Sequence, residues 1–166
     1  MIVVSDTTPL ISLLKVEHLS LIKDLFGQIL IPGAVFDELV SNPRFSEEAQ
    51  KIMEADYIIR TEIEDRSHVD LLHRATGLDL GESESIWLCD SRKADLLLMD
   101  EAKGRQIAKQ MGLSVMGTIG MLMVSAQEGL LTKSEIEICI TTLRQNGRHI
   151  SESLYQQLLD RLHSEK

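Results

Sequence analysis

Five short apolar runs alternate along the chain with longer segments of helical periodicity. The apolar runs cover residues 2–5, 29–31, 57–59, 94–99 and 113–116. Runs of this length and composition are typical of buried strands, and the segments between them are long enough for the helical crossovers that parallel strands require. The sequence therefore predicts an α/β fold: a three-layer α/β/α architecture with a central parallel sheet.

The helical segments place the boundaries of this fold. Apolar spacing predicts a helical stretch over about 10–25, broken near 17–20, and further helices at 34–40, 47–55, 67–76, 81–93, 101–111, 119–128, 133–144 and 151–162. No linker, low-complexity tract or repeat interrupts the pattern. We therefore expect a single domain over residues 1–166, with a core at about 1–125 and a helical C-terminal extension at about 126–166.

Composition limits the class of protein. The 166 residues are 43% hydrophobic and include only three prolines, which is enough apolar material for a core and argues against disorder. Cys89 and Cys139 form no metal-binding or redox motif, so we expect reduced core thiols. No apolar run is long enough to span a bilayer and no signal peptide is visible, which predicts a cytoplasmic protein without a membrane partner.

Two of the apolar runs end in an aspartate, Asp6 and Asp100. The carboxyl ends of parallel strands open onto the crevice where α/β sheets bind ligands, so neighbouring strands would bring these carboxylates together. Each aspartate taken alone is equally well explained as a helix cap. Capping is a poor explanation for both, because it would have to place an aspartate at a strand tip twice.

Two glutamates extend this acidic set. Glu82 lies in the first turn of a predicted helix, where capping explains it as well as function does, and Glu38 lies in the helix after the second strand, where a solvated face is the simpler interpretation. Clustered carboxylates repel one another, and a hard divalent cation such as Mg²⁺ or Mn²⁺ removes that repulsion while accepting phosphate oxygens as further ligands. The four acids together predict a metal site that binds phosphate.

Positive charge is concentrated in one part of an acidic chain. The formal net charge is −9, yet the segment 92–109 is locally basic, which is also typical of an ordinary solvated helix. Lys103 and Arg105 follow Asp100 closely enough to contact a substrate phosphate. Thr7 could bind a ligand or phosphate in the same way, whereas local capping is the simpler explanation of Thr118.

Four motifs and one weaker segment resemble the PIN-domain superfamily, in particular a prokaryotic subgroup related to VapC-like toxins. The motifs are SDTTPLISL at 5–13, VFDELV at 35–40, GLDLGESESI at 77–86 and ADLLLMDEAKGRQIAKQMGLSVMGTIGML at 94–122, and the weaker segment is NGRHISESLYQQLL at 146–159. The resemblance covers most of residues 1–125, and its specificity lies in the ordered combination.

The resemblance implies an acidic pocket formed by Asp6, Glu38, Glu82 and Asp100. Glu82 is preferred to Glu84 because its 18-residue separation from Asp100 matches the family spacing. The chain departs from many PIN domains in having Glu82 in place of Asp and Leu98 in place of Thr or Ser. We expect Asp6 and Asp100 to be the principal metal ligands.

The predicted roles of the two glutamates are less specific. Glu82 is expected to ligate the metal or position water, and Glu38 to ligate a second metal or act as a base. One ion or two would satisfy this pattern.

The function implied is a metal-dependent endoribonuclease that hydrolyses RNA phosphodiester bonds, acting as the toxin of a toxin–antitoxin pair. A small antitoxin protein and a homodimer are implied by the resemblance alone. A PIN-like module that binds nucleic acid or protein without cutting is the alternative. A receiver-type phosphoacceptor fits less well, because it requires paired acids after the first strand and SDTTP supplies one.

Overall fold

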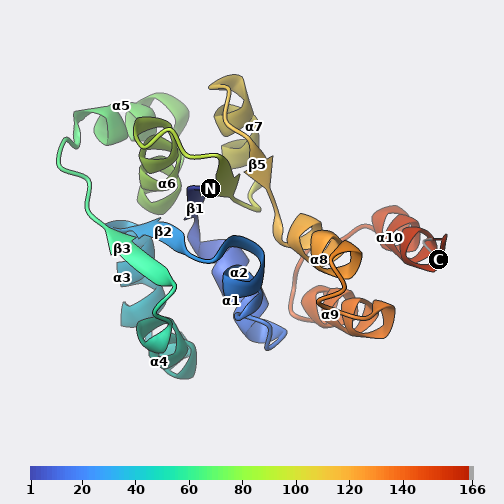
Figure 1. The fold of residues 1–166 in the computed structure, drawn as a ribbon. Coiled ribbons are helices and arrows are strands. Elements are labelled where there is room, and N and C mark those ends of the chain that lie inside the picture. The colour runs from blue at the N-terminus through green and yellow to red at the C-terminus, as the bar shows by residue number, and fades with distance from the viewer. Residues whose placement is uncertain (165–166) are drawn as a thin grey trace.

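A five-stranded, entirely parallel sheet forms the centre of the computed structural model, which describes residues 1–164 (Figure 1). The strand order is β3-β2-β1-β4-β5, so β1 is the central strand. The strands are β1 (Val3–Ser5), β2 (Ile29–Pro32), β3 (Ile58–Thr61), β4 (Leu96–Leu98) and β5 (Val115–Met116). The predicted parallel sheet is confirmed.

Helices connect successive strands throughout the described residues. They are α1 (Thr7–Lys15), α2 (Leu21–Phe26), α3 (Gly33–Ser41), α4 (Ser46–Glu54), α5 (Ser67–Thr76), α6 (Leu80–Ser91), α7 (Ala102–Gln110), α8 (Thr118–Gln127), α9 (Lys133–Gln145) and α10 (Glu152–Ser164), with a 3₁₀ turn at Pro43–Phe45. The predicted break between α1 and α2 is present, and Glu17 there has a φ of 60°. Gly77 ends α5 as expected, with a left-handed φ of 72°.

Side chains on the two faces of the sheet belong to two separate hydrophobic clusters. Val3 and Leu98 face a large cluster with α1, α2, α3 and the C-terminal helices, whereas Val4 and Leu97 face a smaller one with α6 and α7. Successive strand residues point to opposite faces, so a strand with helices on both sides must be apolar throughout. This explains why the strands read as continuous apolar runs, and it confirms the three-layer arrangement.

The fourth strand is shorter than the apolar run predicts. The chain leaves α6 through a turn in which Lys93 has a φ of 52° and the Ala94 N–H donates to the Cys89 carbonyl. This turn uses Ala94 and Asp95, so β4 begins only at Leu96. Trp87, expected inside with its neighbours, is only half-buried. Its ring stacks at 4.0 Å on that of His68, whose side chain is itself exposed, so the pair lies at the surface.

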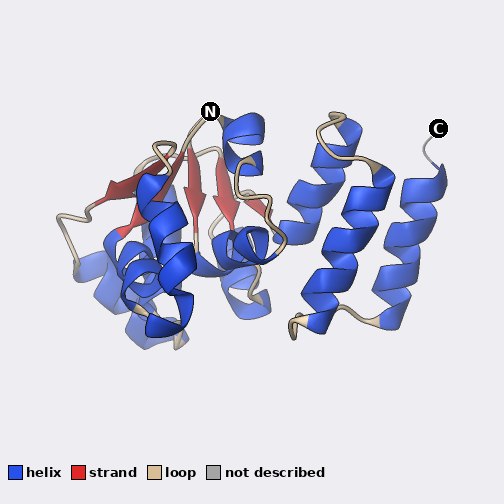
Figure 2. Ribbon diagram, turned by 90° about the horizontal axis from the view of Figure 1, so that it is seen from below, coloured by secondary structure: helices blue, strands red, loops and turns tan. Residues whose placement is uncertain are grey.

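The last three helices, α8, α9 and α10, stand side by side at one end of the sheet (Figure 2). Their buried side chains, including Ile140, Leu143, Leu158 and Leu162, belong to the same cluster as β1 and α1. The segment between α9 and α10 returns toward the carboxyl ends of the strands. None of the helices in residues 1–164 is long and apolar enough to cross a bilayer.

Candidate active site

The two strand-tip aspartates lie at the same edge of the sheet. β1 and β4 are hydrogen-bonded neighbours, with Ser5 opposite Leu98, and the Asp6 N–H donates to the Leu98 carbonyl at 2.9 Å. Asp6 is also the residue before α1, and Asp100 comes two residues after β4 ends. The parallel register therefore brings both aspartates to the carboxyl edge of the sheet.

Asp6 is buried among other carboxylates. Only 4% of its surface is exposed, and burial raises its pKa from 3.8 to about 7. The negative charges of Asp79, Glu82 and Glu38 also raise the pKa, while a backbone hydrogen bond from Thr7 acts in the opposite direction. Ionised Asp6 is thus held at a substantial electrostatic cost.

Glu38 reaches this group from α3. The Thr7 hydroxyl at the start of α1 donates to Glu38 Oε2 at 2.8 Å, so the first turn of one helix fixes a carboxylate carried by another. A Cβ atom on Gly81 would lie 3.6 Å from the same Oε2 and 3.5 Å from Asp79 Oδ1. Glu38 and Asp79 therefore both lie next to the first turn of α6.

Glu82 takes part in a capping box at the start of α6. The Glu82 N–H donates to Asp79 Oδ1 at 2.7 Å, and the Asp79 N–H donates to Glu82 Oε2 at 2.9 Å. Burial raises the pKa of Glu82, with Asp79 and Glu101 adding to the effect and Lys103 opposing it. Capping and membership of the acidic group, the two explanations the sequence left open, are both true of this side chain.

Glu84 has different partners. Its carboxylate forms a 2.7 Å ion pair with Arg66 and accepts a 2.8 Å hydrogen bond from the Ala34 N–H at the start of α3. Both carboxylate oxygens are therefore engaged, one with a charge and one with a helix end. These contacts join α6 to α3 and to the residue before α5, and they favour a structural role for Glu84.

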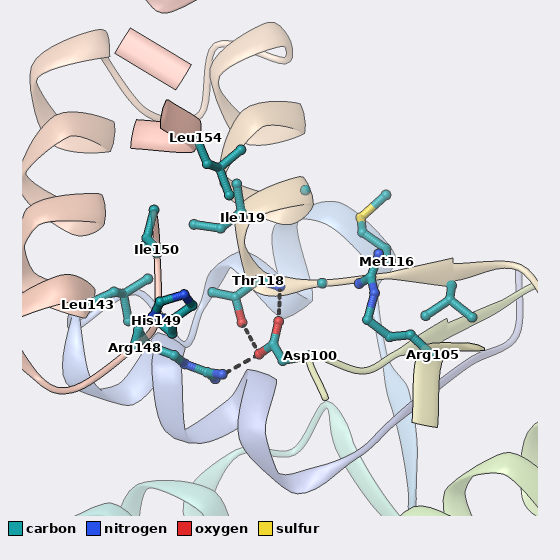
Figure 3. A pocket seen from close by; sticks show the side chains of 13 residues that line it. Asp100, Arg105, Met116, Thr118, Ile119, Leu143, Arg148, His149, Ile150 and Leu154 are labelled. Atoms are coloured by element: carbon teal, nitrogen blue, oxygen red, sulfur yellow. Dashed lines mark hydrogen bonds and ion pairs between the residues drawn. The ribbon is translucent and has the colours of Figure 1, made fainter. Parts of the chain in front are cut away.

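Asp100 is held by the helices that follow it (Figure 3). The Thr118 N–H donates to Oδ1 at 2.7 Å and the Thr118 hydroxyl to Oδ2 at 2.6 Å. Arg148, from the segment between α9 and α10, donates to Oδ2 at 2.8 Å and also binds the Ser12 hydroxyl and the Thr8 carbonyl. One guanidinium thus ties the end of β4 to α1 and to the C-terminal helices.

Gly117 leaves no room for a side chain beside this aspartate. A Cβ atom there would lie 2.7 Å from Arg105 Nη1 and 2.9 Å from Asp100 Oδ1, both closer than real Cβ contacts. Arg105 Nη1 in turn donates to the Met99 carbonyl at 3.0 Å. The missing side chain lets Arg105 and Asp100 approach the backbone at the start of α8.

Comparison with known proteins settles the family. A model of the DUF3368 family, described as a PIN domain, matches residues 2–164. The chain belongs to the PIN-domain family. Searches of curated proteins and of solved structures give no significant match. PIN domains are generally nucleases that use divalent metal ions, so a nuclease acting on nucleic acid is the activity class of this PIN domain.

The donor set of this PIN domain suits a hard cation. Asp6, Glu38 and Glu82 supply only oxygen ligands. The pKa of Asp6 is raised mainly by burial and to a smaller extent by the neighbouring negative charges, and a bound cation would offset both effects. Within residues 1–164, however, no three His, Cys, Asp or Glu side chains are already arranged to hold a metal ion. Asp100 makes its described hydrogen bonds with Thr118 and Arg148, so the expected four-acid pocket is divided between two hydrogen-bond networks.

Sequence reasoning missed two residues of this site. Asp79 has a recognisable signal, because an aspartate three residues before Glu82 matches a capping box. Arg148 lies in the weaker family-like segment at 146–159, but its separation of 48 residues from Asp100 gives no indication of the contact. The structure also gives Thr118 a partner that local capping did not predict.

Proposed function

We propose that this PIN domain is a metal-dependent endoribonuclease that hydrolyses RNA phosphodiester bonds with Mg²⁺ or Mn²⁺. The main support is the buried carboxylate of Asp6, surrounded by Asp79, Glu82 and Glu38 at the carboxyl edge of the sheet. Burying an ionised carboxylate without a positive partner is costly, and proteins retain such groups chiefly for function. Membership of a nuclease family makes a cation and a phosphate the fitting partners.

Asp6 and Asp100 are the proposed principal metal ligands, joined by Glu82 or, for a second ion, by Glu38. The bound cation would lower the pKa of a water and stabilise charge on the phosphate. Thr7 holds Glu38 beside Asp6, and Thr118 and Arg148 hold both oxygens of Asp100, so coordination of a metal by Asp100 would require one of those contacts to give way. Both acids are therefore fixed in orientation before a metal or substrate binds.

Lys103 and Arg105 are proposed contacts for substrate phosphate. Both lie on α7, directly after Asp100, and the Met99 carbonyl fixes the guanidinium of Arg105 beside that aspartate. Contacts to phosphate position the strand without selecting a sequence. Their removal is expected to weaken RNA binding uniformly across sequences.

The decisive experiment is a cleavage assay on labelled single-stranded and structured RNA, with a matched single-stranded DNA. Reactions contain Mg²⁺, Mn²⁺ or EDTA and compare the wild type with Asp6→Asn. Asp56→Asn is the matched control, because it makes the same chemical change at a side chain that is 83% exposed. We expect metal-dependent RNA cleavage that Asp6→Asn abolishes and Asp56→Asn retains.

Three results would count against the proposal. Full cleavage by Asp6→Asn would remove the acidic group from the mechanism. RNA binding without cleavage, by folded protein in either metal, would favour the catalytically silent binding module. Cleavage of the DNA alone would retain the nuclease and reject RNA as the substrate.

The biological role proposed is that of a toxin inhibited by a small antitoxin protein, and the toxin itself is proposed to be a homodimer. This rests on the resemblance of the four motifs that contain Asp6, Glu38, Glu82 and Asp100 to VapC-like proteins. Light scattering on the purified protein tests the dimer. Co-expression with the product of a neighbouring small gene tests the antitoxin, which should form a stable complex and suppress cleavage.

A further inference from the structure

A cavity of about 490 Å³ opens beside Asp100, between the end of β5 and the segment that joins α9 to α10. Its apolar wall includes Met116, Ile119, Ile150 and Leu154 (Figure 3). Leu154 is 40% exposed and His149 is also exposed, so the cavity is open to solvent. The volume is within the range of small-molecule sites, which begins at about 300 Å³.

Two arginines stand at this cavity on either side of Asp100 (Figure 3). Arg105 is held by the Met99 carbonyl, and Arg148 by Asp100 and by Ser12. Guanidinium groups match the geometry of phosphate oxygens, and their fixed orientation lowers the entropic cost of binding. Asp100 also lines the cavity and pairs with Arg148 at 2.8 Å, so two guanidinium groups and one carboxylate leave a net positive charge beside the apolar hollow, which favours an anionic ligand with an apolar body.

We propose that this cavity is a nucleotide subsite, which holds the base and sugar of one unstacked RNA nucleotide while Arg105 and Arg148 bind its phosphate. The inference rests on the proposed ribonuclease function and names the part of the site that selects the base beside the cut. An apolar hollow takes up a base only when the base has left its stack, so the substrate is single-stranded. His149 supplies a ring on which that base can stack.

Leu154→Trp tests the subsite without disturbing the core. The position is exposed, so the larger side chain fills the hollow from its rim. Ile138→Trp is the matched control, because Ile138 is 65% exposed and lines a different surface hollow between α1 and α9. Binding is measured by fluorescence anisotropy of a short labelled single-stranded RNA in EDTA, and base preference by sequencing the ends produced from a randomised RNA in Mn²⁺.

We expect Leu154→Trp to weaken RNA binding roughly tenfold, the effect of losing about one base contact, and to flatten the base preference at one position next to the cut. Ile138→Trp should match the wild type in both assays. Arg105→Gln should reduce the salt dependence of binding by about one phosphate contact. A photoactivatable base at the preferred position should cross-link to the peptide containing His149.

The outcomes separate this inference from the proposed function. If Leu154→Trp leaves RNA affinity and base preference unchanged, the subsite proposal is wrong and the proposed ribonuclease function is unaffected. A cavity that binds a protein side chain instead of a nucleotide would give this result. Absence of cleavage together with cross-linking at His149 overturns the ribonuclease but supports a nucleotide site. Cross-linking confined to other elements overturns the subsite whatever the cleavage result.

Discussion

Replacing Asp6 by asparagine is expected to stabilise the metal-free protein at neutral and alkaline pH. Burial raises the pKa of Asp6 from 3.8 to about 7, so the folded protein keeps a proton that the unfolded chain has lost. Stability therefore falls as the pH rises from about 4 to 7, and the loss is complete above pH 7. Each pKa unit corresponds to about 1.4 kcal/mol, which gives a cost of up to about 4 kcal/mol.

Asparagine has nearly the same shape and cannot ionise, so Asp6→Asn avoids this cost. The assay is urea unfolding of both proteins in EDTA at several pH values from 4.5 to 8.5. The difference in unfolding free energy between them removes the contribution of titrating groups far from Asp6. The gap should be small at the acidic end and grow to up to about 4 kcal/mol above pH 7. In a chain of 166 residues this corresponds to a rise in Tm of roughly 10 °C.

Magnesium provides the second half of this test. Added at pH 8, Mg²⁺ should stabilise the wild type and narrow the gap, because a bound cation would offset the charge of Asp6. Asp6→Asn should respond weakly. A gap that stays constant from pH 4.5 to 8.5 would refute the reasoning, since it would mean that Asp6 ionises in the folded state as easily as in the unfolded chain.

Three further predictions concern the surroundings of the site. Gly117→Ala places a Cβ atom against Arg105 and Asp100, so we expect the free energy of unfolding in urea to fall by about 1–3 kcal/mol and RNA cleavage by the folded protein to be reduced. Wild-type values in both assays would contradict the close contact. Glu84→Ala removes the carboxylate that pairs with Arg66 and accepts from the Ala34 N–H, so the free energy of unfolding should fall by about 1–3 kcal/mol while cleavage per folded molecule is retained. Lost cleavage at unchanged stability would instead make Glu84 the third acid of the site. Burial raises the pKa of both Cys89 and Cys139 to about 11, so a thiol reagent at pH 8 should label them only after denaturation, and rapid labelling of the native protein would show them accessible.

The fold was largely predictable because its signals are local. Apolar runs marked all five strands, and glycines at 27 and 77 marked helix ends where the backbone adopts a positive φ. The start of β4 was misplaced because the turn at Lys93–Ala94 depends on a hydrogen bond to Cys89, which apolar composition does not show. Trp87 was misplaced for a similar reason, since its stacking partner His68 lies on another helix.

The site was less predictable because its signals are long-range. Alternation of strands and helices implied that Asp6 and Asp100 share an edge of the sheet, and the pairing of β1 with β4 places them there. The orientation of each carboxylate depends on residues far away in sequence, such as Thr118 and Arg148 for Asp100. Whether the four acids act together on a metal stays a prediction that the cleavage assay tests.

The surroundings of Asp100 depend on Arg148, a residue near the C-terminal end of the sequence that is translated late. The arginine follows Asp100 by 48 residues, so translation delivers Asp6, Glu38, Glu82 and Asp100 well before it delivers the guanidinium that fixes Asp100. Domains generally fold as units, and α9 and α10 supply part of the hydrophobic cluster that β1 and α1 share, so that cluster is complete only after the C-terminal helices are made. The four acidic residues are therefore synthesised before the arginine that fixes Asp100. The complete arrangement around Asp100 forms only once the segment containing Arg148 has packed against α1.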